Sequence, residues 1–152
     1  MLKLVPPTER LITVEDTAEM ALDHKNSVGL ISVKGELGDA RINLEDLLNA
    51  SLRMRPDRII LGELRGAEAK TFLRAINTGH PGSITTIHAD SPHGAFEQIA
   101  LMALQAGMPL SRIETIDYVR SIIEIAIHVV RDGGSRRIAE IMFTPTGRAT
   151  KT

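Results

Sequence analysis

The stretch Arg58-Ile59-Ile60-Leu61-Gly62-Glu63 lies near the middle of the chain and joins three apolar residues to a glycine and a carboxylate. Its apolar positions do not alternate with polar ones. Such a run is typical of a central strand in a parallel sheet, because helices cover both faces of that kind of sheet. The stretch therefore predicts a buried strand over Ile59–Glu63 with an acidic group at its carboxyl end.

The pattern continues on both sides of this strand. Residues 11–14 and 83–88 are rich in β-branched side chains and are predicted as further strands. Capping residues, prolines and glycines mark the limits of the helices between them. Strands that alternate with helices in this way indicate an α/β fold with a mostly parallel sheet. Four helices are predicted: from Asn43 to before Pro56, from Gly66 to Thr78, from Ser91 to Gly107, and from the capping box of Ser111 and Glu114 onward.

Strands are also predicted on either side of this core, with a weak pattern before it and a clear pattern after it. Short strands are predicted at Val28–Val33 and Ala40–Ile42, beside several glycines. Isoleucines and valines alternate from Ile123 to Val130, and residues 132–135 form a turn before a return strand at 138–143, so this region is predicted as a β-hairpin. The interpretation is one domain over residues 1–143 and a small, polar tail over 144–152 that we expect to be disordered.

The amino-acid composition excludes several classes of protein. The chain has 152 residues, a formal net charge of -1 and no cysteine. A near-neutral charge argues against a general nucleic-acid binder, and the missing cysteines exclude disulfides, thiolate zinc sites and cysteine nucleophiles. No apolar run approaches the roughly 20 residues of a membrane helix, and no signal-peptide pattern opens the chain. These features fit a cytoplasmic protein.

Three polar clusters follow predicted strands: Glu15-Asp16, the run 62–65, and the histidine-bearing loop 80–88. The carboxyl ends of parallel strands converge on the ligand crevice, so we expect these side chains to lie together. Carboxylates there suit Mg²⁺, which usually arrives with phosphates.

Plainer explanations stay open for each cluster on its own. A glutamate after a buried strand is often only solvated, and Asp16 can cap a following helix. The histidines match no helical metal-binding spacing, which argues against a structural metal site.

The combined pattern is more specific than its parts. The stretches 53–66 and 75–89 closely resemble the hexameric secretion ATPases, and best the VirB-type traffic ATPases of type IV secretion and conjugation systems. The family's Asp box resembles residues 13–16, its Walker B element resembles 58–63, and its His box resembles 79–88. The likeness runs from about Val5 to Phe143. Type II secretion and type IV pilus motors carry the same set of Asp box, Walker B element and His box, and they are the alternative within this family.

The resemblance implies a RecA-like ATPase core that uses ATP and Mg²⁺. Glu15 would orient or deprotonate the attacking water, and Glu63 would hold the Mg²⁺ shell, directly or through water. Asp16, Arg65, His80 and His88 would contact the nucleotide or sense its phosphates. Arg55 is the candidate for a contact with a neighbouring subunit's site.

One part of the family pattern is missing from these residues. The phosphate-binding loop G-x-x-x-x-G-K-[ST] occurs nowhere in the sequence, and Met1 to Pro7 resembles the end of the helix that follows such a loop. The interpretation is the C-terminal part of the ATPase core without its first strand and P-loop, catalytically incompetent alone. A non-catalytic interaction module or a decayed ATPase remnant is the alternative.

The resemblance also implies partners and a location. The family assembles as homohexamers and works with other secretion-machinery ATPases and inner-membrane components. We therefore expect a cytoplasmic protein placed peripherally at the inner face of the bacterial inner membrane. No direct nucleic-acid binding is expected from the charge balance.

Overall fold

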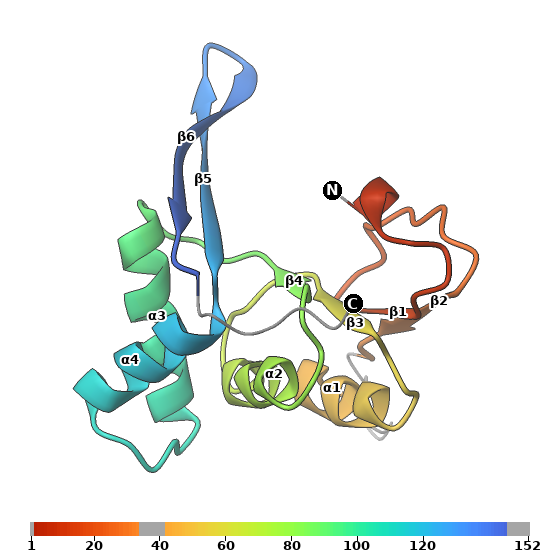
Figure 1. The fold of residues 1–152 in the computed structure, drawn as a ribbon, viewed down its shortest axis with the longest axis horizontal. Helices are drawn as coiled ribbons and strands as arrows, with labels where there is room; N and C mark the ends of the chain where they lie inside the picture. The colour runs from red at the N-terminus through yellow and green to blue at the C-terminus, as the bar shows by residue number, and fades with distance from the viewer. Residues whose placement is uncertain (1, 34–41, 146–152) are drawn as a thin grey trace.

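The computed structural model describes residues 2–33 and 42–145. Within them a parallel sheet, four helices and a separate β-hairpin follow in the order that the sequence predicts (Figure 1). The predicted tail at 144–152 lies outside the described residues except for its first two. The elements are a 3₁₀ turn η1 (Leu2–Leu4), β1 (Leu11–Glu15), β2 (Ser27–Ile31), α1 (Leu44–Leu52), β3 (Arg58–Leu61), α2 (Glu68–Asn77), β4 (Ile84–Thr85), α3 (Pro92–Gln105), α4 (Arg112–Ile122), β5 (Ile125–Asp132) and β6 (Ser135–Phe143).

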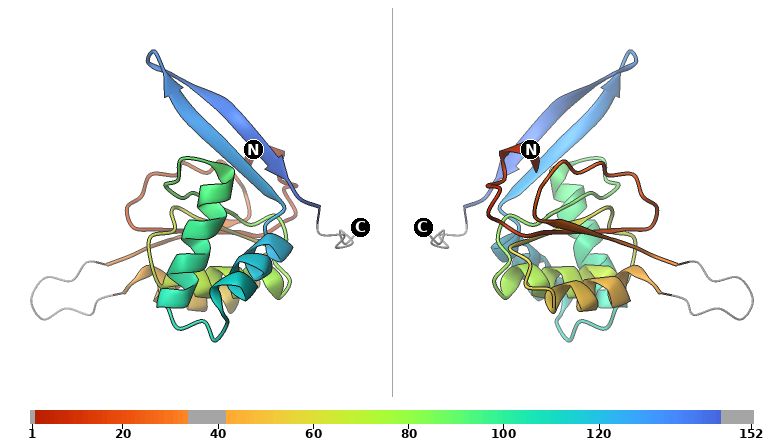
Figure 2. Two further views of the ribbon diagram at one scale, coloured as in Figure 1. Left: turned by 90° about the vertical axis from the view of Figure 1, so that its left-hand side faces the viewer. Right: turned by 90° about the vertical axis from the view of Figure 1, so that its right-hand side faces the viewer.

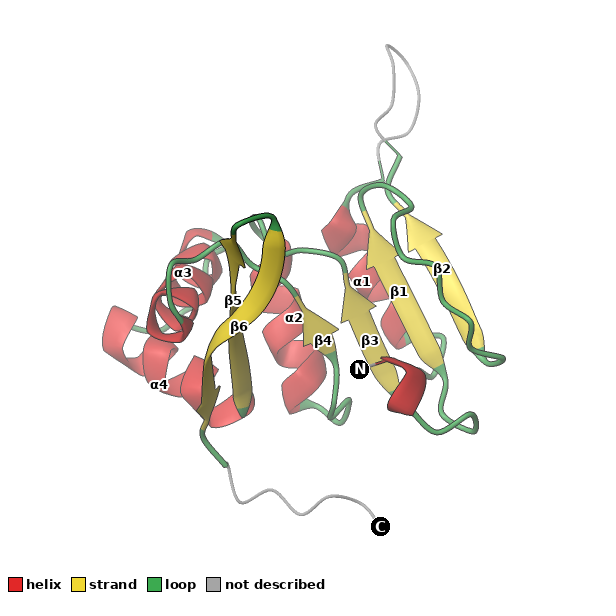
Figure 3. Cartoon of the chain, turned by 90° about the horizontal axis from the view of Figure 1, so that it is seen from above, coloured by secondary structure: helices red, strands yellow, loops and turns green. Residues whose placement is uncertain are grey.

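The sheet has four parallel strands in the order β2-β1-β3-β4, seen from above in Figure 3. All five residues of β1 are buried, and Ile59 of β3 lies beside Ile12 of β1. Helices α1 and α2 lie along one face of the sheet (Figure 1). The predicted central strand is therefore confirmed as β3, which ends at Leu61, so Gly62 and Glu63 lie just beyond it.

Local sequence signals set the helix ends. The side chain of Asn43 accepts a hydrogen bond from the Asp46 backbone N–H at 2.9 Å, and the Asp46 carboxylate accepts one from the Asn43 N–H at 3.2 Å. Ser111 and Glu114 form the same reciprocal capping box at the start of α4. Ser91 caps α3 with Pro92 in its first turn, as predicted. Helix α2 begins two residues later than predicted.

Two strand predictions need correction. The strand predicted at 83–88 is only two residues long, Ile84–Thr85, because the backbone after β3 bends at Gly62. Beyond that bend, Thr86 contacts the bent segment instead of continuing the strand pairing. The Thr86 hydroxyl donates to the Gly62 carbonyl at 2.7 Å, and the Leu64 N–H donates to the Thr86 carbonyl at 2.9 Å. In the predicted pair at 28–33 and 40–42, β2 is confirmed, Val33 and Ile42 form one antiparallel bridge, and Ala40 lies outside the described residues.

The predicted hairpin is confirmed, and it projects away from the rest of the molecule in the three views of Figures 1 and 2. Its two-residue turn is Gly133-Gly134, with φ of 53° and 93°. Positive φ at both positions is the type I′ geometry that matches the twist of the two strands, and glycine adopts it without strain. Among the described helices, none is long and apolar enough to cross a membrane.

Candidate functional site

The candidate site lies at the carboxyl edge of the parallel sheet, where β1 and β3 end beside each other. Glu15 is the last residue of β1, and Glu63 follows β3 by two residues. The Gly62 N–H donates to the Val14 carbonyl at 2.9 Å, which ties the two strand ends together. The sequence prediction that these two strand ends lie side by side at one edge of the sheet is confirmed.

Glu15 is held in place by the loop that follows it. The residue is only 6% exposed, and its Oε1 accepts the backbone N–H groups of Glu19 at 3.0 Å and Met20 at 2.9 Å. Two such bonds compensate a carboxylate for much of the water it loses on burial. Within the described residues, Oε2 of Glu15 has no hydrogen-bond partner.

Glu63 is the centre of an ionic cluster. Its Oε2 accepts a hydrogen bond from Arg65 Nε at 2.6 Å and lies 2.5 Å from Arg65 Nη2, and its Oε1 lies 2.9 Å from Nε2 of His88. The hydrogen bond to Glu63 is the main reason that the pKa of Arg65 is raised above its ordinary value. The His88 ring is otherwise solvent-facing, with 95% of its side chain exposed. The structure thus brings Glu63, Arg65 and His88 together, as predicted.

Asp16 joins the same cluster from the end of β1. Its Oδ2 lies 3.6 Å from Arg65 Nη1, and its Oδ1 accepts a hydrogen bond from the Ser32 hydroxyl at 2.8 Å. The guanidinium of Arg65 therefore contacts carboxylates from two neighbouring strand ends. The sequence did not indicate Ser32, because its role depends on β2 lying beside β1.

Glu68 is a second residue that sequence reasoning missed. Its Oε1 accepts the backbone N–H groups of Arg65 at 2.5 Å and Gly66 at 2.7 Å, and the residue is buried. Ala67, the N-cap of α2, makes no side-chain cap, so Glu68 supplies an acceptor at this helix start instead. The contact fixes the backbone that carries Arg65. An acidic residue in the first turn of a predicted helix is the signal that could have found it.

The expectation that His80 shares this edge is wrong. His80 precedes β4, whereas His88 follows it, so the two histidines lie at opposite ends of that strand. The Nδ1 of His80 forms a hydrogen bond with the Ala75 carbonyl at 2.8 Å, in the last turn of α2. The parallel direction of β4 is the physical reason, since a residue before a parallel strand lies at its amino end.

Arg55 also lies away from the cluster, in the connection from α1 to the amino end of β3. It is exposed, and its φ of 53° is in the left-handed region. Pro56 disfavours the right-handed helical conformation at the preceding residue, which explains why α1 does not continue to this point. The structure does not test the predicted contact of Arg55 with another subunit.

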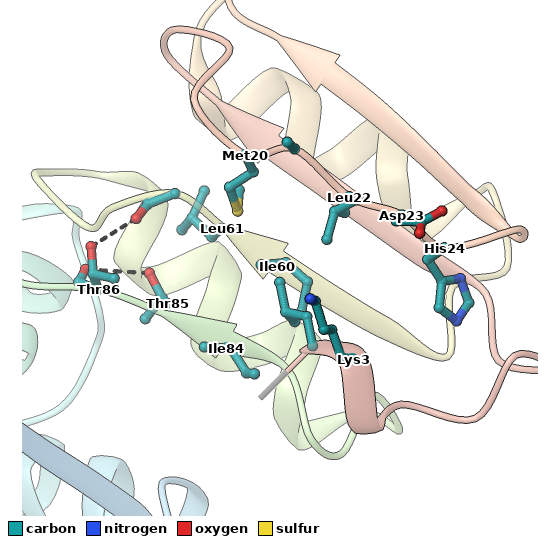
Figure 4. A pocket seen from close by; sticks show the side chains of 13 residues that line it. Lys3, Met20, Leu22, Asp23, His24, Ile60, Leu61, Ile84, Thr85 and Thr86 are labelled. Carbon is teal, nitrogen blue, oxygen red and sulfur yellow. Dashed lines mark hydrogen bonds between the residues drawn. The ribbon is translucent and has the colours of Figure 1, made fainter.

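A cavity of about 500 Å³ opens between the loop after β1 and strands β3 and β4 (Figure 4). Its floor includes Ile60, Leu61 and Ile84, and Met20 and Leu22 face it from the loop. Its lining includes Gly62 and Thr86, so the cavity reaches the strand ends next to Glu63. Because Glu15 holds Met20, the carboxylate also shapes this cavity.

The carboxylates of Glu63 and Asp16 fit a Mg²⁺ ion that takes its other ligands from water and phosphate. Among the described residues, no three acidic, histidine or cysteine side chains come together as a metal site. Mg²⁺ keeps several waters and commonly takes one or two protein carboxylates together with phosphate oxygens. Glu63 and Asp16, which share a single guanidinium here, supply that donor set but not a complete cage.

Comparison with known proteins identifies the group to which this chain is related. The family described as "Type II/IV secretion system protein" matches residues 1–138. The chain belongs to this family. A type IV secretion system protein VirB11 from Bartonella quintana is 41% identical over 143 residues, which cover 93% of this chain and 40% of that protein. Protein VirB11 from Agrobacterium fabrum is 37% identical over 150 residues, 97% of this chain and 44% of that protein.

Solved structures agree with the family in fold. The crystal structure of the VirB11 ATPase from the Brucella suis type IV secretion system has a TM-score of 0.83 and 36% identity, and the match covers 93% of this chain and 42% of that one. The pilus retraction motor PilT with bound ADP gives a TM-score of 0.63 at 30% identity, covering 91% of this chain and 40% of that one. The predicted α/β ATPase core with a C-terminal hairpin is confirmed. The chain spans about two fifths of these relatives' length.

Proposed function

We propose that this chain is the C-terminal part of the ATPase core of a type IV secretion or conjugation motor, which couples ATP hydrolysis to assembly of the system or to transport of protein or DNA. One observation carries the proposal: Glu15 ends β1, and Glu63 follows the adjacent parallel strand β3 by two residues at the same edge of the sheet. The likeness to a VirB11 ATPase over 93% of the chain supports it. The lower TM-score of the PilT match ranks a type II secretion or pilus motor second.

The proposed division of labour follows from the contacts of each side chain. Glu15 has one oxygen fixed by the loop and Oε2 without a partner, so Oε2 would orient the attacking water and take its proton. Glu63 would face the Mg²⁺ shell, directly or through water, with Asp16 beside it. Bound ATP and Mg²⁺ would supply the phosphoanhydride bond and the charge that polarises it.

The cations of the cluster have the chemistry of phosphate contacts. Arg65 presents a guanidinium that is mostly exposed, and His88 presents an exposed ring nitrogen, so both can exchange Glu63 for phosphate oxygens. In this proposal they report whether the γ-phosphate is present. His80 would act from the other end of β4, through the C-terminal turn of α2 that it holds, rather than at the same edge. Arg55 is proposed to meet a neighbouring subunit.

The P-loop pattern is not among these residues, so tight ATP binding is proposed to need sequence from a longer form of the protein. The proposed assembly is a homohexamer, cytoplasmic and peripheral at the inner face of the inner membrane. It would meet other secretion ATPases and inner-membrane components, without direct contact to nucleic acid.

A chimera tests the proposal. The part of the Brucella suis relative that precedes the matched region is joined to this chain, and ATP hydrolysis is measured with Mg²⁺. Glu15→Gln should lower kcat by about 10²–10⁴-fold with ATP binding retained, because the amide keeps the loop hydrogen bonds and loses the base. Glu19→Gln on the same loop is the matched control and should leave kcat within about twofold.

Two outcomes would contradict the proposal. Unchanged turnover in Glu15→Gln would remove this carboxylate from catalysis. A folded chimera that binds ATP without hydrolysing it would favour the non-catalytic interaction module or a decayed ATPase. Calorimetry on the 152-residue chain alone should give no micromolar affinity for ATP with Mg²⁺, and such an affinity would show that the phosphate site lies within these residues.

A further inference from the structure

The two carboxylates that would face Mg²⁺ already contact polar groups of the chain itself. On Glu63, Oε2 accepts a hydrogen bond from Arg65, and Oε1 lies 2.9 Å from the ring of His88. On Asp16, Oδ1 accepts a hydrogen bond from the Ser32 hydroxyl, and Oδ2 lies 3.6 Å from Arg65. Each of the four carboxylate oxygens therefore has a polar neighbour, and Arg65 contacts both side chains.

The guanidinium of Arg65 competes with a metal ion for the same oxygens. It reaches Glu63 through Nε and Nη2, at 2.6 and 2.5 Å, and it faces Asp16 through Nη1. A Mg²⁺ ion needs lone pairs of these oxygens, whether it binds them directly or through its waters. Two cations beside one pair of carboxylates also repel each other. Metal binding therefore has to displace Arg65 or to tolerate its charge at short range.

The side chain of Arg65 can move while its backbone stays fixed. Its side chain is 62% exposed, compared with 19% for the side chain of Glu63. The backbone N–H groups of Arg65 and Gly66 donate to Oε1 of the buried Glu68, at 2.5 and 2.7 Å. Exposed side chains change rotamer within nanoseconds, whereas a hydrogen-bonded backbone does not follow them. The guanidinium can thus leave both carboxylates by rotation of its own side-chain bonds.

We propose that Arg65 is a built-in counter-ion that keeps Mg²⁺ from binding to Glu63 and Asp16 until a phosphate group draws the guanidinium away. Guanidinium binds phosphate oxygens with the same planar fork that it uses for carboxylates, so a phosphate can take the place of Glu63 as its partner. The two carboxylates then accept a metal ion together with phosphate rather than alone. This inference rests on the proposed function and adds the regulation of its metal site.

Two plainer roles for Arg65 predict different behaviour. If its ion pairs only stabilise the fold, their removal should lower the melting temperature without tightening metal binding, although pairs as exposed as these add little stability. If Arg65 only contacts phosphate, its removal should weaken nucleotide binding and leave the affinity for a metal ion alone unchanged. A counter-ion predicts changes of opposite sign, because its removal tightens metal binding and weakens nucleotide binding.

Mn²⁺ is the probe for the 152-residue chain, because it takes the same oxygen ligands as Mg²⁺ and its free form is measured by electron paramagnetic resonance. Arg65→Gln should bind Mn²⁺ at least about fivefold more tightly than the native chain, since the amide carries no charge. Arg112→Gln is the matched control, because it removes an equal charge from another mostly exposed ion pair, with Glu97 at 2.7 Å. It should leave the Mn²⁺ affinity within about twofold. Thermal melting checks that each variant folds.

Two further measurements locate the metal ion and test the link to phosphate. Glu63→Gln, added to Arg65→Gln, should cancel the gain in Mn²⁺ affinity, because the carboxylate that the gain depends on is lost. In the chimera with the Brucella suis relative, Arg65→Gln should weaken the binding of ADP without metal by about tenfold, as expected for the loss of charge-assisted hydrogen bonds. Opposite signs in the Mn²⁺ and ADP titrations are the signature of the counter-ion, and a purely structural role would not produce them.

Three outcomes would overturn the inference. If Arg65→Gln binds Mn²⁺ no more tightly than the native chain, or if neither binds it detectably, Arg65 does not restrain the metal, and the proposed function still stands. If the gain survives Glu63→Gln, the ion binds elsewhere, and the metal role of Glu63 in the proposed function fails as well. An equal gain in Arg112→Gln would show a general effect of net charge rather than a property of Arg65.

Discussion

The strand pair β1–β3 and the hairpin β5–β6 contain similar apolar residues, yet their surroundings are opposite. In β1 and β3, the apolar side chains are buried almost completely, with α1 and α2 packed along the sheet. In the hairpin, the apolar face points to solvent and the more polar face meets the rest of the molecule. Apolar residues in a strand thus indicate a surface to be covered, but they do not say whether the same chain covers it.

The largest expected difference between the two regions is in side-chain truncation. Phe72 of α2 is 1% exposed, and Phe143 of β6 is 64% exposed. Phe72→Ala should lower the free energy of unfolding by about 3–5 kcal/mol, because it leaves a cavity in the core. Phe143→Ala should change it by about 0.5 kcal/mol or less. Urea unfolding of both variants checks this, and equal losses would show that the hairpin face is buried in solution.

A second test compares a buried carboxylate with an exposed one. Glu15→Ala should cost about 1–3 kcal/mol, because it leaves the backbone N–H groups of Glu19 and Met20 without their acceptor. Hydrogen exchange should show faster exchange at those two amides. Asp132→Ala at the hairpin tip should cost about 0.5 kcal/mol or less, since its ion pair is solvent-exposed. Unchanged exchange at residues 19 and 20 in Glu15→Ala would contradict the contact.

The ion pair of Glu9 and Arg58, in the body of the molecule, should make the free energy of unfolding depend on pH. The hydrogen bond from Arg58 holds the pKa of Glu9 below its ordinary value of 4.5. The pair therefore stabilises the fold above that value, and its contribution is lost as the pH falls through the lower folded pKa. Glu9→Gln should cost about 1 kcal/mol or less at pH 7, because the pair is only partly shielded from solvent.

The measurement is the difference in unfolding free energy between the native chain and Glu9→Gln from pH 7 to pH 3. The difference should shrink steadily below about pH 4.5. A difference that grows on acidification would reverse the sign and refute the assigned cause.

The smallest expected effect uses two residues with the same backbone angle. Arg55 in the body and Gly133 in the hairpin turn both have a φ of 53°. Arg55→Gly should raise stability by about 0.5 kcal/mol, because relief of the left-handed strain slightly exceeds the entropy cost of glycine. Gly133→Ala should lower it by about 1 kcal/mol for the same reason. A loss on Arg55→Gly, measured by thermal unfolding, would show that the arginine side chain stabilises this corner through a contact.

Local signals made much of the fold predictable. The capping boxes of α1 and α4, the proline at the start of α3 and the glycine pair of the hairpin each act within a few residues, so they can be identified in the sequence. The placement of Glu15 and Glu63 was also predictable, since parallel strands share an edge. What could not be predicted depends on distant partners.

Three findings illustrate that limit. Strand β4 is short because Thr86 meets the turned backbone at Gly62, 24 residues away in sequence. His80 lies at the amino end of β4 and forms a hydrogen bond with the last turn of α2. Because His80 and His88 are close in sequence, the sequence alone did not separate their positions. The register of the hairpin depends on a bulge at Ala139, where His128 pairs with Glu140 and Val129 pairs with Ile138, and a bulge is defined only by the partner strand. In each case tertiary contacts decide what the local pattern leaves open.

The open turn of the hairpin has a practical consequence. Among the residues that the structure describes, no atom beyond the chain neighbours lies within 4 Å of a Cβ placed at Gly133 or Gly134. Ser135 beside them is exposed, and the sequence contains no cysteine. Ser135→Cys would therefore introduce a single thiol that can be labelled without competing sites. A fluorophore or spin label placed there would stand at the tip of the hairpin, beyond the pair Arg131 and Arg136, and would report, by quenching or by distance, when another molecule reaches the hairpin.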